Sequence, residues 1–355
     1  MTPLGQHLSD QIRIHGPLSI AGYMASALGH PKWGYYTSRD PLGRSGDFTT
    51  APEISQMFGE LIGLWCADRW QAMRAPAKFV LVELGPGRGT LIADALRAAA
   101  ALPGFEKAVD LHLVETSPVL RAAQEIFLEG QQAIWHERIE DLPESPVIAI
   151  ANEFFDALPI RQFQATEDGW HERLVDADEK GFHLVLSPQA TPGDVITNAA
   201  PGDIFEISPP REAAVSELSR RIADRGGAAL IIDYGHEISS VGDTLQAMHA
   251  HKYTDPLQNP GDADLTAHVD FQALRQAAEN AGAETRGPVT QGSFLQQLGI
   301  TLRADHLGRR ATTAQIKDID LAVHRLTAKG QMGDLFKVLA ITRPDDPAPP
   351  GFEKA

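Results

Sequence analysis

The chain has 355 residues, a length that predicts about two domains or one core with large insertions. It is 43% hydrophobic and 22% charged, which is typical of a packed globular protein, and its net charge of −16 disfavours nucleic acid as a partner. Cys66 is the single cysteine, so an intrachain disulfide and a cysteine-rich zinc site are both excluded.

The sequence contains no apolar run of about 18 residues, the length that a membrane-spanning helix requires. The stretch MTPLGQHLSDQIRIHG lacks a secretory apolar segment and the pattern of a transit peptide, so we expect a cytoplasmic protein. Cys66 lies in the apolar helical stretch MFGELIGLWCADRW, which favours buried packing over a nucleophilic role.

Residues 1–75 predict mostly helices, with a loop rich in glycine and aromatic residues between them. FVLVELGPGRG (79–89) then predicts a strand, a tight glycine turn and the start of a helix. DLHLVETS (110–117), AIWHERI (133–139) and PVIAIANE (146–153) predict three further strands. The long apolar runs within this set are typical of strands that are covered on both faces.

The pattern changes after residue 160. Residues 161–187 alternate between apolar and polar side chains and carry two turn signals, which predicts antiparallel hairpins. Helices are predicted at 211–225 and 268–282, and buried strands at 228–235 and 333–343.

This order of elements predicts an α/β fold with a doubly wound, Rossmann-like, mostly parallel sheet. The N-terminal helices and the inserted segments would form a second, discontinuous α+β subdomain that binds substrate or acts as a lid over the carboxyl edge of the sheet. The predicted division is an N-terminal helical cap (1–75), the first half of the cofactor-binding domain (76–160), inserted hairpins (161–205), core (206–235), an insertion (236–267), core (268–290), a helical insertion (291–330), the last core strand (331–343) and a loose tail (344–355).

The glycine turn carries the strongest local motif, in which Gly85, Gly87 and Gly89 alternate and Glu83 precedes them. Glycines let the backbone turn sharply and approach a ligand, and the amide donors of the next helix face the same point. Glu115 at the end of the second strand suits the two hydroxyls of a ribose, and Thr116 follows it.

A dinucleotide and S-adenosylmethionine both fit such a turn. Thr90 stands where the dinucleotide motif has glycine or alanine, and the Glu83 carboxylate would repel a pyrophosphate. The same carboxylate suits the ammonium and the sulfonium of S-adenosylmethionine, so the sequence favours that cofactor.

The sequence resembles the MidA-like family, the S-adenosylmethionine-dependent protein arginine methyltransferases linked to assembly of respiratory complex I. The resemblance runs from residue 16 to about residue 340 and rests on the stretches GPLSIAGYMASAL, HPKWGYY, GDFTTAPEISQMFGELIG, VELGPGRGTL, LVETSP, ANEFFDALP, LIIDYG and MGDLFKVL. It implies that the cofactor site lies on Glu83, Gly85, Gly87, Gly89 and Glu115. It also implies symmetric dimethylation of arginine and a protein substrate, with a complex I subunit as one possibility. The missing transit peptide suggests a bacterial member.

The stretch NEFFDALP places Asn152, Glu153 and Asp156 directly after a buried strand. In open α/β sheets, ligands bind at the carboxyl ends of the strands. If a helix starts there, Glu153 and Asp156 share one face and can bind an arginine guanidinium as a pair, with Asn152 holding the cofactor or the acceptor. The alternative is that Asn152 only caps that helix and that the two acids lie in its first turn, where negative charge stabilises a helix.

GDFTTAPE (46–53) is a candidate second polar wall for the substrate, through the four side chains Asp47, Thr49, Thr50 and Glu53, or an ordinary N-cap before the next helix. The aromatic residues Trp33, Tyr35 and Tyr36 either line an acceptor channel, for which Tyr35 is our candidate, or pack in the core. The pair His249 and His251 has poor spacing for a metal on a helix, and we predict no metal site.

Three functions remain open from the sequence, and a dehydrogenase is a distant fourth. The first is methyl transfer to a protein arginine, the second is methyl transfer to a small molecule, and the third is an assembly factor that binds S-adenosylmethionine without catalysis. The sequence does not name the target protein, the degree of methylation or the oligomeric state.

Overall fold

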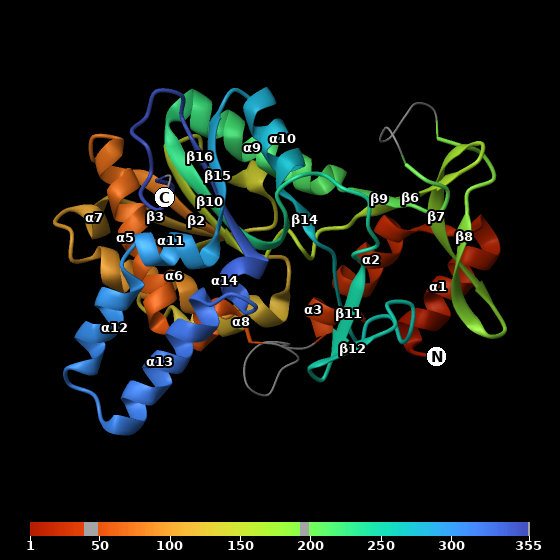
Figure 1. Cartoon of the computed structure of the whole chain (residues 1–355), viewed down its shortest axis with the longest axis horizontal. Helices are drawn as coiled ribbons and strands as arrows, with labels where there is room; N and C mark the ends of the chain where they lie inside the picture. The colour runs from red at the N-terminus through yellow and green to blue at the C-terminus, as the bar shows by residue number, and fades with distance from the viewer. Residues whose placement is uncertain (39–48, 192–198, 354–355) are drawn as a thin grey trace.

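A computed structural model of the chain describes residues 1–38, 49–191 and 199–353 (Figure 1). Its centre is an eight-stranded sheet in which seven strands follow the order β15-β16-β10-β5-β2-β3-β4, while β14 pairs with the end of β10. The strands are β2 (Phe79–Leu84), β3 (Val109–Val114), β4 (Ile134–His136), β5 (Val147–Asn152), β10 (Gly227–His236), β14 (Val269–Asp270), β15 (Glu284–Thr290) and β16 (Phe336–Thr342).

The sheet is mostly parallel, as the sequence predicted. β4, β3, β2, β5 and β10 are parallel to one another, and β16 runs antiparallel to both β10 and β15. The predicted strands up to residue 153 and those at 228–235 and 333–343 are confirmed. β15 was not predicted as a strand.

Helices cover both faces of this sheet. Successive strand residues point to opposite faces, so Phe79 and Leu81 pack with α5 and α6, whereas Val80 and Val82 pack with α9 and α10. Double coverage explains why the core strands are unbroken apolar runs. The helices that follow the core strands or pack on them are α4 (Ala51–Ile54), α5 (Gln56–Ala72), α6 (Thr90–Ala99), α7 (Phe105–Ala108), α8 (Pro118–Phe127), η1 (Ile139–Asp141), α9 (Pro209–Arg225) and α10 (Phe271–Asn280).

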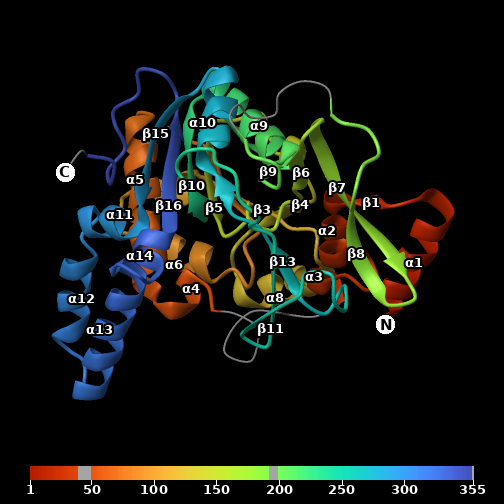
Figure 2. The same cartoon turned by 45° about the vertical axis from the view of Figure 1, so that its right-hand side comes forward.

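A second body, which we call the lobe, lies beside this core on the right of Figure 1 and comes forward in Figure 2. Its own buried cluster joins Leu4 and Tyr23 of the N-terminal helices to Val175 of the hairpins and Leu265 of the later insertion. The lobe consists of α1 (Pro3–His15), β1 (Leu18–Ser19), α2 (Ile20–Gly29), α3 (Tyr35–Ser38), β6 (Arg161–Thr166), β7 (Gly169–Asp178), β8 (Gly181–Leu186), β9 (Ile204–Ile207), β11 (Gln246–His249), β12 (Lys252–Thr254) and β13 (Asp264–Thr266).

The hairpins predicted at 161–187 are present as β6, β7 and β8. Two other segments differ from the expected division, because α4 and α5 and the helices of 291–330 pack with the main sheet and not in the lobe. Phe294 and Leu326 share one cluster with Trp65 of α5 and Phe79 of β2. These last helices are α11 (Gln291–Gln297), α12 (Ile300–Gly308), α13 (Thr313–Thr327) and α14 (Met332–Leu335).

Within the described residues, every helix is too short or too polar to cross a bilayer. Cys66 is 1% exposed within α5, and burial raises the pKa of its thiol well above the usual range, so the predicted packing role is confirmed.

Candidate active site

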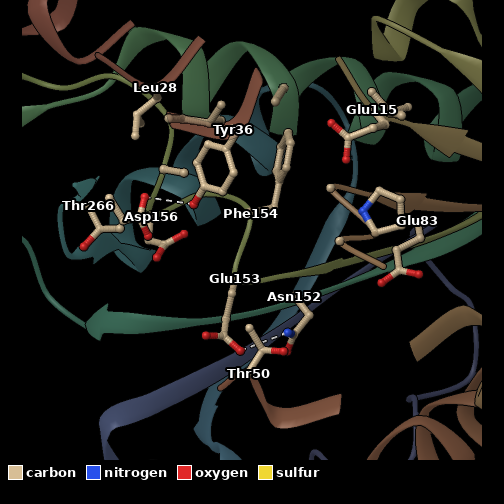
Figure 3. Close-up of a pocket in the computed structure, with 18 of the residues that line it drawn as sticks. Leu28, Tyr36, Thr50, Glu83, Glu115, Asn152, Glu153, Phe154, Asp156 and Thr266 are labelled. Atoms are coloured by element: carbon tan, nitrogen blue, oxygen red, sulfur yellow. Dashed lines mark hydrogen bonds between the residues drawn. The ribbon is translucent and has the colours of Figure 1, made fainter. Parts of the chain in front are cut away.

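A cavity of about 990 Å³ lies at the carboxyl ends of β2, β3, β5 and β10, where the main sheet faces the lobe (Figure 3). Two groups of lining residues lie on different sides of it. The glycine-loop side consists of Glu83, Gly85, Gly87, Glu115 and Thr116. The lobe side consists of Tyr36, Asp156, Tyr234, Asp264 and Thr266. Figure 3 shows Glu83 and Glu115 away from Asp156 and Thr266, with Tyr36 and Phe154 between them.

The glycine turn after β2 has the left-handed backbone that its sequence predicted. Gly85, Gly87 and Gly89 have φ angles of 61°, 55° and 86°. A Cβ atom on Gly85 would lie 2.9 Å from the Phe154 ring, so this position requires glycine for space as well as for conformation. Gly89 is the N-cap of α6 and is not among the cavity's lining residues.

Glu83 presents a buried carboxylate to the cavity. Glu83 is 3% exposed, and its Oε2 atom has no hydrogen-bond partner among the described residues. Burial raises the pKa of Glu83 to about 8, although the backbone N–H of Ile92 acts in the opposite direction. A buried acceptor atom without a partner is costly, and a ligand that donates a hydrogen bond or carries positive charge would satisfy it.

Glu115 is held in place by two donors. Ser117 N donates to Glu115 Oε1 at 2.7 Å, and Gln124 Nε2 contacts Glu115 Oε2 at 3.2 Å and Gly87 O at 2.7 Å. Gln124 is itself fixed by Trp135 Nε1 at 2.8 Å. Burial raises the pKa of the Glu115 carboxyl. The sequence did not reveal Gln124, which links the acid after β3 to the glycine turn after β2.

The turn after β5 does not continue as a helix, and residues 153–158 form bends and a turn. Glu153 has a φ angle of +51°, which is uncommon for a residue with a side chain. Both interpretations of NEFFDALP that assumed a helix are therefore wrong on this point. Asn152 is the last residue of β5 and caps no helix, and the turn, not helical spacing, brings Glu153 and Asp156 into one cavity.

Glu153 and Asn152 contact each other at the floor of the cavity as drawn in Figure 3. Asn152 Nδ2 and the Ala51 backbone N–H both donate to Glu153 Oε1, each at 3.2 Å. Burial, and then the charge of Asp156, raise the pKa of Glu153 to about 7. Asn152 is 7% exposed, and its Oδ1 atom has no partner among the described residues. It is thus a second buried acceptor that lines the cavity.

Asp233, an acid that interrupts the apolar run of β10, holds the backbone of the turn that carries Asp156. Asp233 Oδ2 accepts from the backbone N–H groups of Phe155 and Asp156 at 3.0 and 3.1 Å. Asp156 is 6% exposed and hydrogen-bonds the hydroxyl of Tyr234. Burial raises the pKa of Asp156, while Tyr234 and the Arg211 guanidinium act against that rise.

Arg211 of α9 binds backbone and not the carboxylates. Its guanidinium donates to Phe155 O at 2.7 Å, to Asp156 O at 3.1 Å, to Ala267 O at 2.9 Å and to His268 O at 2.6 Å. This buried cation therefore ties the turn after β5 to the segment after β13. Neither Arg211 nor Asp233 was a candidate in the sequence, although an acid at the end of an apolar strand is the signal that singled out Glu115.

The second polar wall is present in part. Thr50 and Glu53 line the cavity, and Glu53 Oε1 accepts from Thr90 Oγ1 at 2.6 Å. Thr49 is described but is not a lining residue, and Asp47 lies outside the described residues. The cap of α5 is Ser55, whose hydroxyl accepts from Met57 N at 3.2 Å.

Tyr35 does not line the cavity, which corrects our choice among the aromatic residues. It is fully buried in the core of the lobe, and its neighbour Tyr36 lines the cavity instead, with the two rings 5.1 Å apart at 82°. Consecutive residues of the short helix α3 point in different directions, so the sequence alone could not distinguish them.

The cavity is acidic. Among the described residues, the lining includes ten Asp and Glu side chains, and the basic side chains there are Arg88, Arg138, His268 and Lys337. In a half-enclosed site this excess favours a cationic ligand. Within the described residues, no three histidine, cysteine or acidic side chains are grouped so that they could hold a metal ion.

Comparisons with known proteins agree with this geometry. A family model for S-adenosyl-L-methionine-dependent methyltransferases matches residues 61–289. The protein arginine methyltransferase NDUFAF7 homolog of Drosophila melanogaster is 40% identical over 95% of this chain and 84% of its own length, and human NDUFAF7 is 38% identical over 96% and 83%. A crystal structure from Burkholderia thailandensis with bound S-adenosyl-homocysteine matches 99% of this chain and 93% of its own, with a TM-score of 0.84 and 29% identity.

The residues of the glycine-loop side fit S-adenosylmethionine. The cofactor carries an ammonium that donates hydrogen bonds, and Glu83 Oε2 and Asn152 Oδ1 are buried acceptors that lack partners among the described residues. Gly85 and Gly87 leave the turn without side chains, and Glu115 offers a carboxylate to a ribose.

Proposed function

Because this chain belongs to the MidA-like family of S-adenosyl-L-methionine-dependent methyltransferases, we propose that it transfers methyl groups from this cofactor to an arginine guanidinium of a protein. One observation carries the choice of acceptor. Glu153 and Asp156 line the same cavity as the glycine turn, and both are carboxylates that suit a guanidinium. The names of the curated relatives support the same acceptor.

In this proposal the glycine-loop side and Asn152 hold the cofactor. Glu83 and Asn152 accept from its ammonium, Gly85 and Gly87 let the backbone approach it, and Glu115 accepts from its ribose. Thr116 is exposed beside Glu115 and lines the same side. When bound, the cofactor supplies an activated methyl group on a sulfonium.

The lobe side and the turn after β5 then hold the acceptor. A guanidinium is planar, carries five N–H donors and keeps its charge in water, so it must be oriented before a nitrogen can react. Glu153 and Asp156 would bind two of its edges and concentrate the charge away from the reacting nitrogen. Methyl transfer forms a nitrogen–carbon bond and breaks the sulfur–carbon bond, whose electron pair stays on sulfur, and the proton lost by the nitrogen passes to the Glu153 carboxylate.

Two finer statements rest on the resemblance alone. We propose that the product is symmetric dimethylarginine and that the acceptor protein is a subunit of respiratory complex I. We also propose that the reaction occurs in the cytoplasm. The net charge of −16 would favour a basic segment of such a partner.

The test is transfer of labelled methyl from S-adenosylmethionine into a lysate of a strain that lacks this protein. Labelled protein should be hydrolysed and its amino acids separated, and label in methylarginine would support the proposal. Label that stays in the low-mass fraction would favour a small-molecule acceptor. Cofactor binding without any transfer would favour a non-catalytic assembly factor, and either result would overturn the proposal.

A further inference from the structure

The lobe supplies a carboxylate and a tyrosine hydroxyl to the cavity. The sequence did not indicate the carboxylate, and it named Tyr36 only among the aromatic residues that could line a channel. Asp264 comes from β13 and Tyr36 from α3, whereas Asp156 comes from the turn after β5. We propose that Asp264 and Asp156 bind the acceptor guanidinium together, one from each body of the protein, with Tyr36 as the residue that positions Asp264. This inference rests on the proposed arginine acceptor and adds to it the residues that select arginine.

Tyr36 places Asp264 at the lobe side of the cavity. The Tyr36 hydroxyl donates to Asp264 Oδ1 at 2.9 Å, and Asp264 is 5% exposed. In Figure 3 the Tyr36 hydroxyl points toward the side of the cavity where Asp156 lies. The charges of Asp264 and Asp156 both raise the pKa of the Tyr36 hydroxyl, after the larger effect of burial, so both acids lie near that hydroxyl.

Backbone contacts fix the two acids relative to each other. The Ala267 N–H donates to Asp156 O at 3.1 Å, and the Arg211 guanidinium binds both Asp156 O and Ala267 O. Ala267 directly follows β13, which carries Asp264 as its first residue. Backbone contacts therefore hold the turn that carries Asp156 against the segment that carries Asp264, and the Tyr36 hydroxyl orients the Asp264 side chain. A binding site for a rigid group requires such fixed supports.

The charge of this part of the cavity favours a cationic ligand, because the described residues that line it are mainly acidic. The nearby cation Arg211 donates to four backbone carbonyls, so its hydrogen-bonding capacity is directed away from the carboxylates. A guanidinium brings five donors, enough for Asp156, Asp264 and the Glu153 carboxylate that the proposed function already assigns to it.

Two carboxylates from opposite bodies favour arginine over lysine. The guanidinium is a planar fork whose separate edges can each meet one carboxylate, whereas the lysine ammonium is a compact charge on a flexible stem. We therefore expect label in methylarginine and little in methyllysine, and we expect this preference to depend on Asp264.

Tyr36 also connects the acceptor to the glycine-loop side. Ser117 Oγ donates to the Tyr36 carbonyl at 2.6 Å, and Ser117 N donates to Glu115 Oε1 at 2.7 Å. The residue that positions Asp264 is thus hydrogen-bonded to the segment that carries the proposed ribose acid. Each change at Tyr36 or Asp264 must consequently be checked for its effect on cofactor affinity.

The first test compares Asp264→Asn with Glu179→Gln, which removes the same charge from an exposed turn of the lobe. The measured quantities are labelled methyl in arginine, using lysate of the deletion strain as the probe, S-adenosyl-homocysteine affinity by calorimetry, and melting temperature. We expect Asp264→Asn to lose roughly ten-fold or more of the transfer rate with near-normal cofactor affinity and melting temperature. Glu179→Gln should match the wild type. A fully active Asp264→Asn protein would overturn the inference.

The second test asks whether Tyr36 acts through Asp264. Tyr36→Phe should reduce transfer mainly by raising the KM for the acceptor, and combined with Asp264→Asn it should add little further loss. Tyr23→Phe removes another buried hydroxyl of the lobe, which donates to Pro256 O, and serves as the control. Additive losses, or equal losses in Tyr23→Phe, would contradict the positioning role.

These results separate the two proposals. If wild-type protein labels no arginine, the proposed acceptor is wrong, and so is the binding of its guanidinium by Asp264 and Asp156. If wild-type protein labels arginine and Asp264→Asn labels it equally well, only the assignment of Asp264 is wrong.

Discussion

Glu153→Gln should make the cofactor-free protein more stable at alkaline pH while it removes activity. The substitution keeps the size of the side chain and an oxygen that can accept from Ala51 N, and it deletes the charge. Burial and the charge of Asp156 raise the pKa of Glu153 from 4.5 to about 7 in the folded protein. A group with a raised pKa stabilises the fold in full below the unfolded pKa, near pH 4.5, and this contribution is lost as the pH rises through 7.

The size of the effect follows from that shift. Each pKa unit corresponds to about 1.4 kcal/mol, so ionising Glu153 in the folded state costs at most about 3.5 kcal/mol. Water in the open cavity screens the half-buried carboxylate and reduces the cost. We therefore expect Glu153→Gln to raise the free energy of unfolding by about 1–3 kcal/mol at pH 8, and to change it by less than about 1 kcal/mol at pH 5.

The assay is denaturant unfolding of cofactor-free protein at both pH values, together with methyl transfer and cofactor affinity at pH 8. Transfer should fall by roughly ten-fold or more, because a misplaced acceptor loses alignment, while S-adenosyl-homocysteine affinity stays near normal. The wild-type rate should also fall as the pH drops below about 7, where Glu153 becomes protonated. A variant that is less stable than the wild type at pH 8 and fully active would refute this reasoning.

Three further substitutions test the parts of the site separately. Glu115→Gln should weaken S-adenosyl-homocysteine binding by about 1–3 kcal/mol in calorimetry, and an unchanged dissociation constant would remove Glu115 from the cofactor site. Arg211→Met should lower the free energy of unfolding by about 3 kcal/mol or more, because four carbonyls lose a buried donor, and a loss below about 1 kcal/mol in denaturant melts would contradict that role. Gly85→Ala should lower the affinity for the cofactor roughly ten-fold, because the added Cβ would contact Phe154. Gly130→Ala is the control, because Gly130 also has a positive φ angle but has open space around it; this variant should carry backbone strain alone and bind the cofactor normally.

The core of the fold was predictable because each strand carries its own signal. The runs FVLV, PVIAIA and AALII are apolar without interruption, and this pattern is typical of strands that are covered on both faces. The glycines after the first run, with φ angles of 61°, 55° and 86°, predicted the turn for the same local reason. β15 was not predicted, because its sequence ETRGPVT is largely polar and contains glycine and proline, which are unfavourable in strands.

The glycine-loop side was predictable because its residues stand at the ends of such strands. Glu83, Glu115 and Asn152 are polar side chains at the carboxyl end of an apolar strand, and the three parallel strands meet at one edge. Asp233 shows the same signal, and attention to it would have found the acid that fixes the turn after β5.

The site residues that the lobe itself supplies could not be predicted in the same way. Asp264 begins a three-residue strand in an insertion, and Tyr36 belongs to a four-residue helix, so neither has a local pattern that fixes its direction. Their contact spans 228 positions of the chain and depends on how the lobe packs. The left-handed backbone of Glu153 was also hidden, because a helix is the ordinary continuation after a parallel strand and this turn adopts a rarer conformation.

The most direct measurement of the central claim is a comparison of methylarginine peptides, by mass spectrometry, in cells that carry wild-type protein, no protein, Glu153→Gln or Glu179→Gln. If the acidic cavity binds an arginine of a protein, at least one methylarginine peptide should occur with the wild type and with Glu179→Gln. The same peptide should be absent from the deletion strain and strongly reduced with Glu153→Gln. An unchanged set of methylarginine peptides in the deletion strain would contradict the account.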